Sequence, residues 1–230
     1  MKKDLYKIDN SIDKLINNKH TLFLDNNEYN QIKYRLNKKS YNIYLPYKDS
    51  EKVILYKDVL PSVTLFKIEA KNTLKHQNIL GSIMALNINS GYLGDIIVDN
   101  DNYYFYVLSD LKEFIIQNLT SIGKEKVTLK ELDLNELCNY ERKYKEIELL
   151  VSSIRIDNVL SKLLNTSRDK VNGIIKNKGV ILNYQILNKN SYYLSNNDVF
   201  SVKRYGKYKY IDIINTTKKD KLVIKLLKYI

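Results

Sequence analysis

The sequence has a single cysteine and no tryptophan, and it contains no apolar run near the eighteen residues that a membrane-spanning helix requires. One cysteine, Cys138, excludes an internal disulfide framework and a cysteine-based zinc cluster, and we expect it to be a partly buried small hydrophobic residue. The first residues, Met1 to Tyr6, are polar and interrupted by an acid, unlike a signal peptide. We therefore expect a cytoplasmic protein.

Sequence signatures of the common nucleotide-dependent enzymes are also missing. The chain has no Gly-x-Gly-x-x-Gly motif, no phosphate-binding loop and no tRNA synthetase signature. His76 has no carboxylate or cysteine partner at a telling spacing, so we expect it to be a structural residue at the start of a helix. The sequence therefore predicts no catalytic residues, no metal site and no cofactor.

Positive charge is concentrated at the C-terminal end. The formal net charge is +12, yet residues 152–230 hold 16 basic and five acidic residues, whereas residues 1–151 hold 22 and 21. This pattern favours a polyanionic partner contacted mainly through the C-terminal domain, because neutralising phosphates releases counterions. A membrane surface is the competing polyanion, but we find no long basic amphipathic helix and no lipidation signal.

Two short amphipathic helices are predicted between residues 153 and 178. The first has one apolar stripe and Ser153 as a candidate N-cap; the stripe is Ile156, Val159, Leu160, Leu163 and Leu164. The second has Ser167 as its N-cap, Gly179 at its end and a buried stripe of Val171, Ile174 and Ile175.

The exposed side of the second helix follows from its periodicity. Residues four apart lie above one another, so Arg168, Asn172 and Lys176 share that side. Arg155 stands at the head of the first helix and Lys178 in the exit turn of the second. We expect this surface to bind phosphate, with Arg155, Arg168 and Lys176 acting as one patch.

This region resembles a known RNA-binding domain. The motifs Arg155-Ile156-Asp157-x-x-Leu160, Ser167-Arg168-x-x-Val171-x-x-Ile174-Ile175, Gly179-Val180-x-Leu182-Asn183 and Asp198-Val199-x-Ser201-Val202 are similar to those of the domain named after ribosomal protein S-four. One departure is Asn197, where the family has glycine, and asparagine tolerates the left-handed turn best among the other residues. We take the following as candidate RNA contacts: Arg155, Ser167, Arg168, Lys170, Asn172, Lys176, Lys178, Asn183, Lys203, Arg204 and Lys207.

The preceding residues predict an α+β region. Leu5, Ile8, Ile12, Leu15 and Ile16 form a weak helical pattern, and residues 53–56 and 63–68 have strand composition. A helix from Thr73, a hairpin across residues 99–102, a helix that the pair Asp110 and Glu113 would cap, and a strand at residues 127–129 then give the order α-β-β-α-β. Residues 144–152 and two strands near the C-terminus would complete the last sheet.

A second resemblance covers roughly residues 55–230. Leu74-x-His76-x-x-Ile79-Leu80-Gly81-Ser82, Gly94-Asp95-Ile96-Ile97-Val98 and Asn118-Leu119-Thr120-x-Ile122-Gly123 are similar to the YlmH family, which joins an RRM-like domain to a C-terminal S-four domain. The sequence departs from that family at Gln77-Asn78. We thus expect an α+β protein with an N-terminal α/β region at residues 1–70, an RRM-like α+β domain at 71–145 and an S-four-type domain at 146–230.

The resemblance also implies a function. It implies a non-catalytic RNA-binding protein, associated with the large ribosomal subunit that still carries peptidyl-tRNA after a stall, in ribosome-associated quality control. The alternative is an rRNA- or tRNA-modifying enzyme, since S-four domains occur in pseudouridine synthases and Arg155-Ile156-Asp157 is similar to their Arg-Leu-Asp motif. A DNA-binding regulator is the third hypothesis, but the second helix offers one arginine and one lysine on its exposed face and no dimerisation heptads follow.

Overall fold

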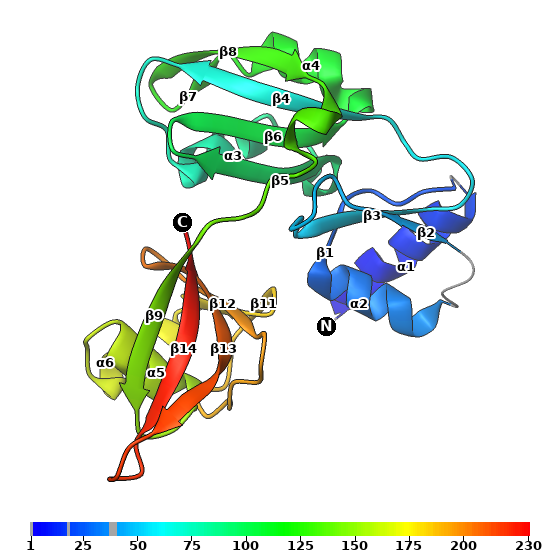
Figure 1. The fold of residues 1–230 in the computed structure, drawn as a ribbon. Helices are drawn as coiled ribbons and strands as arrows, with labels where there is room; N and C mark the ends of the chain where they lie inside the picture. Colours follow the sequence, from blue (N-terminus) through cyan, green and yellow to red (C-terminus); the bar gives the residue numbers. More distant parts are fainter. Residues whose placement is uncertain (1, 18, 37–40) are drawn as a thin grey trace. The chain divides into compact units, whose positions relative to one another are not determined.

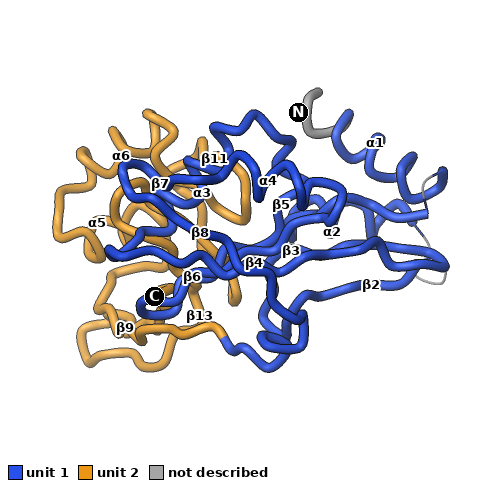
Figure 2. Tube along the Cα trace, turned by 90° about the horizontal axis from the view of Figure 1, so that it is seen from above, with its two compact units in different colours: residues 1–141 blue, residues 142–230 orange. Residues whose placement is uncertain are grey.

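The computed structural model describes residues 2–17, 19–36 and 41–230, with side chains from Tyr6 onward in the first range. The chain divides into two compact units, residues 1–141 and 142–230 (Figure 2). Helices and strands are mixed in both units, so the fold class is α+β as predicted.

The first unit begins with a small helical and three-stranded part. Its elements are α1 (Lys2–Asn17), β1 (Leu24–Asp25), α2 (Asn26–Arg35), β2 (Asn42–Tyr44) and β3 (Lys52–Tyr56), with the strand order β1-β3-β2 (Figure 1). Ile8 and Leu15 are buried and Ile12 is half-buried, as the predicted helical stripe requires, but Ile16 is 53% exposed and does not belong to it. The side chain of Leu5 lies outside the described part.

A five-stranded antiparallel sheet forms the rest of the first unit. Its elements are β4 (Val63–Ala70), α3 (His76–Ala85), β5 (Leu93–Asp99), β6 (Asn102–Leu108), α4 (Lys112–Asn118), β7 (Ser121–Ile122) and β8 (Glu125–Leu132), with short 3-10 turns η2 (Ser90–Tyr92), η3 (Ser109–Leu111) and η4 (Leu134–Leu137). The strand order is β5-β6-β4-β8-β7. Because β4 pairs with both β6 and β8, the first strand of this domain lies before residue 70, and the structure differs from the expected boundary there.

Both faces of the five-stranded sheet are packed. Alternate residues of a strand point to opposite faces, so Phe66 lies in the core that α3 and α4 share, and Leu65 lies in a second core. Phe23 and Ile54 from the N-terminal part belong to that second core. The N-terminal part therefore covers part of the sheet face that lacks helices, and residues 1–141 form one compact unit.

Two expectations for this unit were wrong. Asp110 does not cap α4: the helix begins at Lys112, its N-cap residue is Leu111 without a side-chain hydrogen bond, and Asp110 belongs to η3. Cys138 is exposed rather than partly buried, because it follows η4 on the surface.

The second unit is a six-stranded sheet with two helices on one face. Its elements are β9 (Tyr144–Val151), α5 (Ile156–Leu163), α6 (Arg168–Lys176), β10 (Val180–Leu182), β11 (Gln185–Ile186), β12 (Val199–Val202), β13 (Gly206–Thr216) and β14 (Leu222–Tyr229), in the strand order β11-β10-β12-β13-β14-β9. Strand β9 pairs with β14 along its whole length, so the sheet begins at Tyr144, two residues before the expected boundary.

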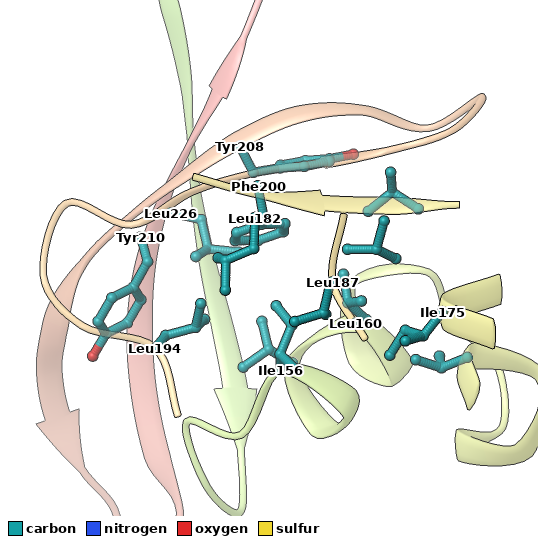
Figure 3. Packing of buried hydrophobic residues seen from close by; sticks show 14 of the residues in the cluster. Ile156, Leu160, Ile175, Leu182, Leu187, Leu194, Phe200, Tyr208, Tyr210 and Leu226 are labelled. Carbon is teal, nitrogen blue, oxygen red and sulfur yellow. The ribbon is translucent and has the colours of Figure 1, made fainter. Parts of the chain in front are cut away.

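The core of the second unit confirms the predicted stripes. Ile156, Val159 and Leu160 of α5 and Val171 and Ile175 of α6 pack against the sheet, each at most 3% exposed. Figure 3 labels Ile156, Leu160 and Ile175 in this core. Burial of these apolar side chains is the main stabilising contribution of so small a domain. It also turns the opposite side of α6 outward.

Among the described residues, no helix combines the length and the apolar composition that crossing a membrane requires. Nor do three or more His, Cys, Asp or Glu side chains gather in a metal-binding group anywhere in residues 2–17, 19–36 and 41–230.

Candidate nucleic-acid interface

The two units differ completely in charge. Residues 1–141 hold 19 basic and 19 acidic residues, and residues 142–230 hold 19 basic and seven acidic residues. The whole net charge of +12 therefore lies in the second unit. Such an excess creates a positive potential that attracts a polyanion before any specific contact forms.

Helix α6 presents part of this charge. Ser167 is its N-cap, and the Ser167 Oγ accepts a hydrogen bond of 3.3 Å from the Lys170 N–H, as predicted. Arg168, Lys170 and Lys176 are exposed, and Asn172 is half-buried between them. Within the described part of the chain, neither Arg168 nor Lys176 forms an ion pair, so both cations are available to an external anion.

The end of α6 has a Schellman geometry with a lysine in the position that usually holds glycine. Lys178 has φ +54°, its N–H donates to the Ile175 carbonyl, and the Gly179 N–H donates to the Ile174 carbonyl. Gly179 itself is needed for space, since a Cβ there would lie 2.8 Å from Ile174 Cγ2 and 2.9 Å from the Ile174 carbonyl oxygen. We had expected Gly179 to end the helix; Lys178 is the left-handed residue instead.

A second basic turn lies beside this one. Strands β10 and β12 pair through Val180 and Val202, and the Lys203 N–H donates to the Gly179 carbonyl at 2.9 Å. Lys203 and Arg204 therefore lie next to Lys178 although they are 25 and 26 residues away in the sequence. Arg204 also has a left-handed backbone, with φ +74°. We call these two turns the basic turn pair: Lys178 belongs to one turn, and Lys203 and Arg204 belong to the other.

Left-handed conformations cost a residue with a Cβ roughly 1–2 kcal/mol relative to glycine. Two of the three members of the basic turn pair, Lys178 and Arg204, adopt such a conformation.

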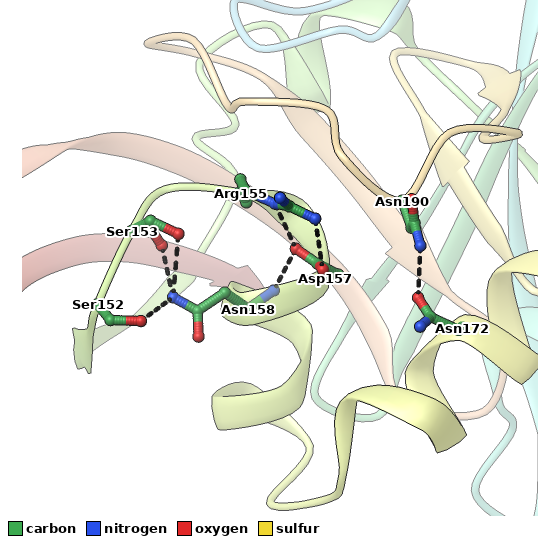
Figure 4. A network of polar contacts seen from close by, with 7 residues as sticks. All are labelled: Ser152, Ser153, Arg155, Asp157, Asn158, Asn172 and Asn190. Carbon is green, nitrogen blue, oxygen red and sulfur yellow. Dashed lines mark hydrogen bonds and ion pairs between the residues drawn. The ribbon is translucent and has the colours of Figure 1, made fainter.

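Arg155 is committed to a buried partner (Figure 4). Its Nη2 and Nε donate to the Asp157 carboxylate at 2.9 and 3.2 Å, and the Asp157 side chain is 5% exposed. This carboxylate, with a smaller contribution from the side chain of Tyr193, raises the pKa of Arg155 above its usual range. Arg155 thus first neutralises a buried charge, and its guanidinium keeps only an exposed edge for a ligand.

The start of α5 differs from the prediction. Arg155 occupies the N-cap position without a capping side chain, and Ser153 does not cap the helix. The Asn158 Nδ2 instead donates to the Ser152 Oγ at 3.0 Å and to the Ser153 carbonyl at 2.9 Å (Figure 4). The buried Asn158 side chain therefore ties the segment before α5 to the helix, which a pattern of apolar residues does not reveal.

Asn183 has a structural task as well. It has φ +47°, its Nδ2 donates to the Asp198 carboxylate at 2.7 Å, and its Oδ1 accepts from the Val199 N–H at 2.9 Å. Asn197 has φ +72°, which confirms the left-handed turn expected of it. The two asparagines and buried Asp198 hold the turns around β10 and β12.

Lys207 faces the other side of the sheet. Tyr208 points into the core beneath α5 and α6, so the neighbouring Lys207 points away from them. Its Nζ lies 5.1 Å from the centre of the Tyr184 ring and 4.8 Å from that of Tyr229. These cation-π contacts hold Lys207 apart from the surface of α6.

One loop near α6 was missed by the sequence reasoning. The Asn190 Nδ2 donates to the Asn172 Oδ1 at 2.9 Å, so the segment between β11 and β12 reaches the exposed side of α6 (Figure 4). Lys189 and Tyr193 of this segment are exposed. The polar run from Asn188 to Ser191 indicates a loop but not its contact with α6.

The structure therefore divides the predicted residues into distinct groups. Helix α6 holds Arg168, Lys170, Asn172 and Lys176, and the basic turn pair adds Lys178, Lys203 and Arg204 directly after it. Ser167, Asn183 and Arg155 serve the local structure of the domain, and Lys207 lies on the opposite sheet face.

Comparisons with known proteins show what this chain is similar to. Residues 62–136 match the family model described as "Putative RNA-binding domain in YlmH", which begins next to β4. The chain is 28% identical over 183 residues to Ribosome-associated protein quality control protein P2 of Bacillus subtilis (strain 168), covering 75% of this chain and 71% of that protein. The structure of Cell division protein ylmH from Streptococcus pneumoniae aligns with a TM-score of 0.47 and 22% identity, over 59% of this chain and 92% of that chain. The sequence relatives confirm the resemblance of the chain to the YlmH family.

Proposed function

We propose that this chain is a non-catalytic, ribosome-associated RNA-binding protein whose main RNA contact lies in residues 142–230. The contact surface is the exposed side of α6, with Arg168, Lys170 and Lys176, continued by the basic turn pair. The observation that carries the proposal is the confinement of the whole net positive charge to this unit, where Arg168, Lys176 and Lys178 form no ion pair among the described residues.

This surface suits the backbone of structured RNA. A guanidinium such as that of Arg168 binds two phosphate oxygens at once, and lysines neutralise phosphates as point charges. Asn172 adds amide groups that hydrogen-bond to 2′-hydroxyls, which distinguish RNA from DNA. Shape and phosphate recognition of this kind positions a protein on RNA without chemistry on the bases.

The relative's name supports the ribosome as the RNA's location, because it describes a ribosome-associated quality control protein. On this basis we propose that the chain binds large-subunit rRNA, on a subunit that still carries peptidyl-tRNA. In this proposal, the chain acts in the quality control of nascent chains that have stalled on the ribosome.

The buried pair Arg155 and Asp157 argues against the pseudouridine synthase alternative. Asp157 lies in the first turn of α5 with its side chain 5% exposed and bound to Arg155, so it does not face a substrate. Arg155, Ile156 and Asp157 form the start of α5, and this structural role accounts for the motif. No observation favours catalysis over binding.

Two triple-alanine variants test the proposal. The first replaces Arg168, Lys176 and Lys178; the matched control replaces Lys218, Lys219 and Lys221 of the exposed turn between β13 and β14, which removes the same charge. We expect the first variant to lose ribosome affinity on the order of 100-fold and to flatten the slope of log affinity against log salt by about 2 to 3. Arg168→Ala alone should cost roughly 1 to 3 kcal/mol.

The measurement is a salt titration of binding to purified ribosomal subunits, with circular dichroism confirming the fold of each variant. Equal losses in both triple variants would show that net charge alone drives binding, and the proposed face would be wrong. Competition with duplex DNA separates an RNA-binding protein from a DNA-binding regulator: a DNA competitor as effective as rRNA would contradict the proposal.

A further inference from the structure

The segment between β11 and β12 is fixed to both helices of the second unit. Beside α5, the Ile156 N–H donates to the Tyr192 carbonyl at 2.8 Å and the Leu194 N–H donates to the Ile154 carbonyl at 3.1 Å. Beside α6, the Asn190 side chain bonds to Asn172 at 2.9 Å. This segment therefore spans the surface between the two helices in a defined conformation.

Tyr193 is presented outward by this arrangement. Leu194, which follows it, is 3% exposed in the core, and the Tyr192 carbonyl before it is hydrogen-bonded, yet the Tyr193 side chain is 58% exposed. Tyr193 forms an isolated antiparallel backbone bridge with Arg155. Since Arg155 is held by buried Asp157, the backbone of Tyr193 lies beside a fixed residue.

Electrostatic surroundings favour an anionic ligand at this ring. Arg155 lies beside it, exposed Lys189 is in the same loop, and the nearby carboxylate of Asp157 is already neutralised by Arg155. Through Asn190, the same loop also contacts Asn172, on the side of α6 that carries Arg168 and Lys176.

We propose that Tyr193 is a stacking platform for one unpaired RNA base. The inference rests on the proposed RNA-binding function and adds a ligand class to it: RNA that displays a bulged or looped-out nucleotide next to a helical stem. Phosphates of the stem bind α6 and the basic turn pair, and the extruded base lies on the tyrosine ring. Recognition of unpaired bases by aromatic side chains is general among RNA-binding proteins because every base has a flat π face.

The test uses two RNA hairpins with the same number of phosphates. One carries a single bulged 2-aminopurine, whose fluorescence is quenched on stacking, and the other is fully paired in its stem. We expect the full-length protein to quench the bulged probe. Tyr193→Ala should abolish quenching and weaken binding of the bulged hairpin about 5- to 100-fold, leaving affinity for the paired hairpin unchanged.

Two further variants separate stacking from structure. Tyr193→Phe keeps the ring and loses the hydroxyl, so it should retain the quenching. Tyr34→Ala removes a tyrosine that is 90% exposed in the first unit and should leave both hairpins unaffected.

A specific set of outcomes overturns the inference. If the wild-type protein binds both hairpins and Tyr193→Ala leaves the bulged complex unchanged, or weakens both complexes equally, Tyr193 is not a base platform while the proposed function stands. If the wild-type protein binds neither hairpin nor ribosomal subunits at low salt, the proposed function itself falls and this inference with it.

Discussion

The two units have equal numbers of basic residues, 19 each, but differ in how many acidic residues balance them. In the first unit 19 acidic residues balance the cations, as in the contacts of Lys7 with Glu28 and of Lys112 with Glu131. In the second unit only seven acidic residues are present, and two of the described ones, Asp157 and Asp198, are buried in structural networks. Counting lysines would not distinguish the units; the missing carboxylates do.

The two units also differ in how the faces of their sheets are covered. The five-stranded sheet of the first unit has a core on each face, and the second core includes Phe23, Tyr47 and Ile54 from the N-terminal part. The covered part of this sheet face does not present its residues to RNA bases. In the second unit the helices themselves carry the exposed cations. Burial and charge therefore both favour residues 142–230 as the proposed main RNA contact.

The largest expected effect tests whether the two units are energetically separate. Val171 is fully buried in the core of the second unit, so Val171→Asp should destabilise that unit by about 3 to 5 kcal/mol, because a carboxylate there has no partner. In urea denaturation followed by circular dichroism, the midpoint of unfolding of the first unit should not change.

Ile174→Asp is the graded comparison. Ile174 is only partly buried against the same core, so its substitution should cost less than that of Val171. Unfolding of both units together in Val171→Asp would contradict the separation into two units.

The second expected effect concerns RNA affinity of the isolated units. A fragment of residues 142–230 includes β9, which pairs with β14 from Tyr144 to Val151, and it should bind ribosomal RNA with most of the affinity of the full chain. A fragment of residues 1–141, whose net charge is zero, should bind on the order of 100-fold more weakly at physiological salt. Filter binding with both fragments measures this ratio. Equal affinities would show that the difference in net charge does not determine which unit binds RNA.

Much of the second unit was predictable from its sequence because its signals are local. The stripes of α5 and α6, the N-cap Ser167 and the left-handed Asn197 depend on residues a few positions apart. The buried pair of Asp157 and Arg155 was not predictable, since a motif does not say which of its charges the fold encloses.

The first unit was less predictable for a related reason. Strand β4 was recognised as a strand, but its place between β6 and β8 depends on pairing partners some forty and sixty residues away in the sequence. Asp110 and Glu113 have the spacing of a capping box, but Asp110 is part of the 3-10 turn η3 and does not cap α4. Likewise, nothing in residues 187–193 alone indicates that Asn190 reaches Asn172 on α6.

The smallest expected effect is the most specific, because it separates fold from function at one residue. Lys178 has φ +54°, so Lys178→Gly relieves left-handed strain and should stabilise the second unit by about 0.5 to 1 kcal/mol, part of the relief being offset by the greater freedom of glycine when unfolded. The same change removes one cation of the basic turn pair, so RNA affinity should fall and the salt slope should flatten by roughly 0.7 to 0.9. Gly179→Ala is the contrasting neighbour: its Cβ would meet Ile174 Cγ2 at 2.8 Å, and stability should fall by about 1 to 3 kcal/mol without loss of a charge. Thermal denaturation and a salt titration on the same samples measure both quantities. A Lys178→Gly variant that is stabilised and binds RNA as well as the wild type would show that this lysine is not part of the RNA contact.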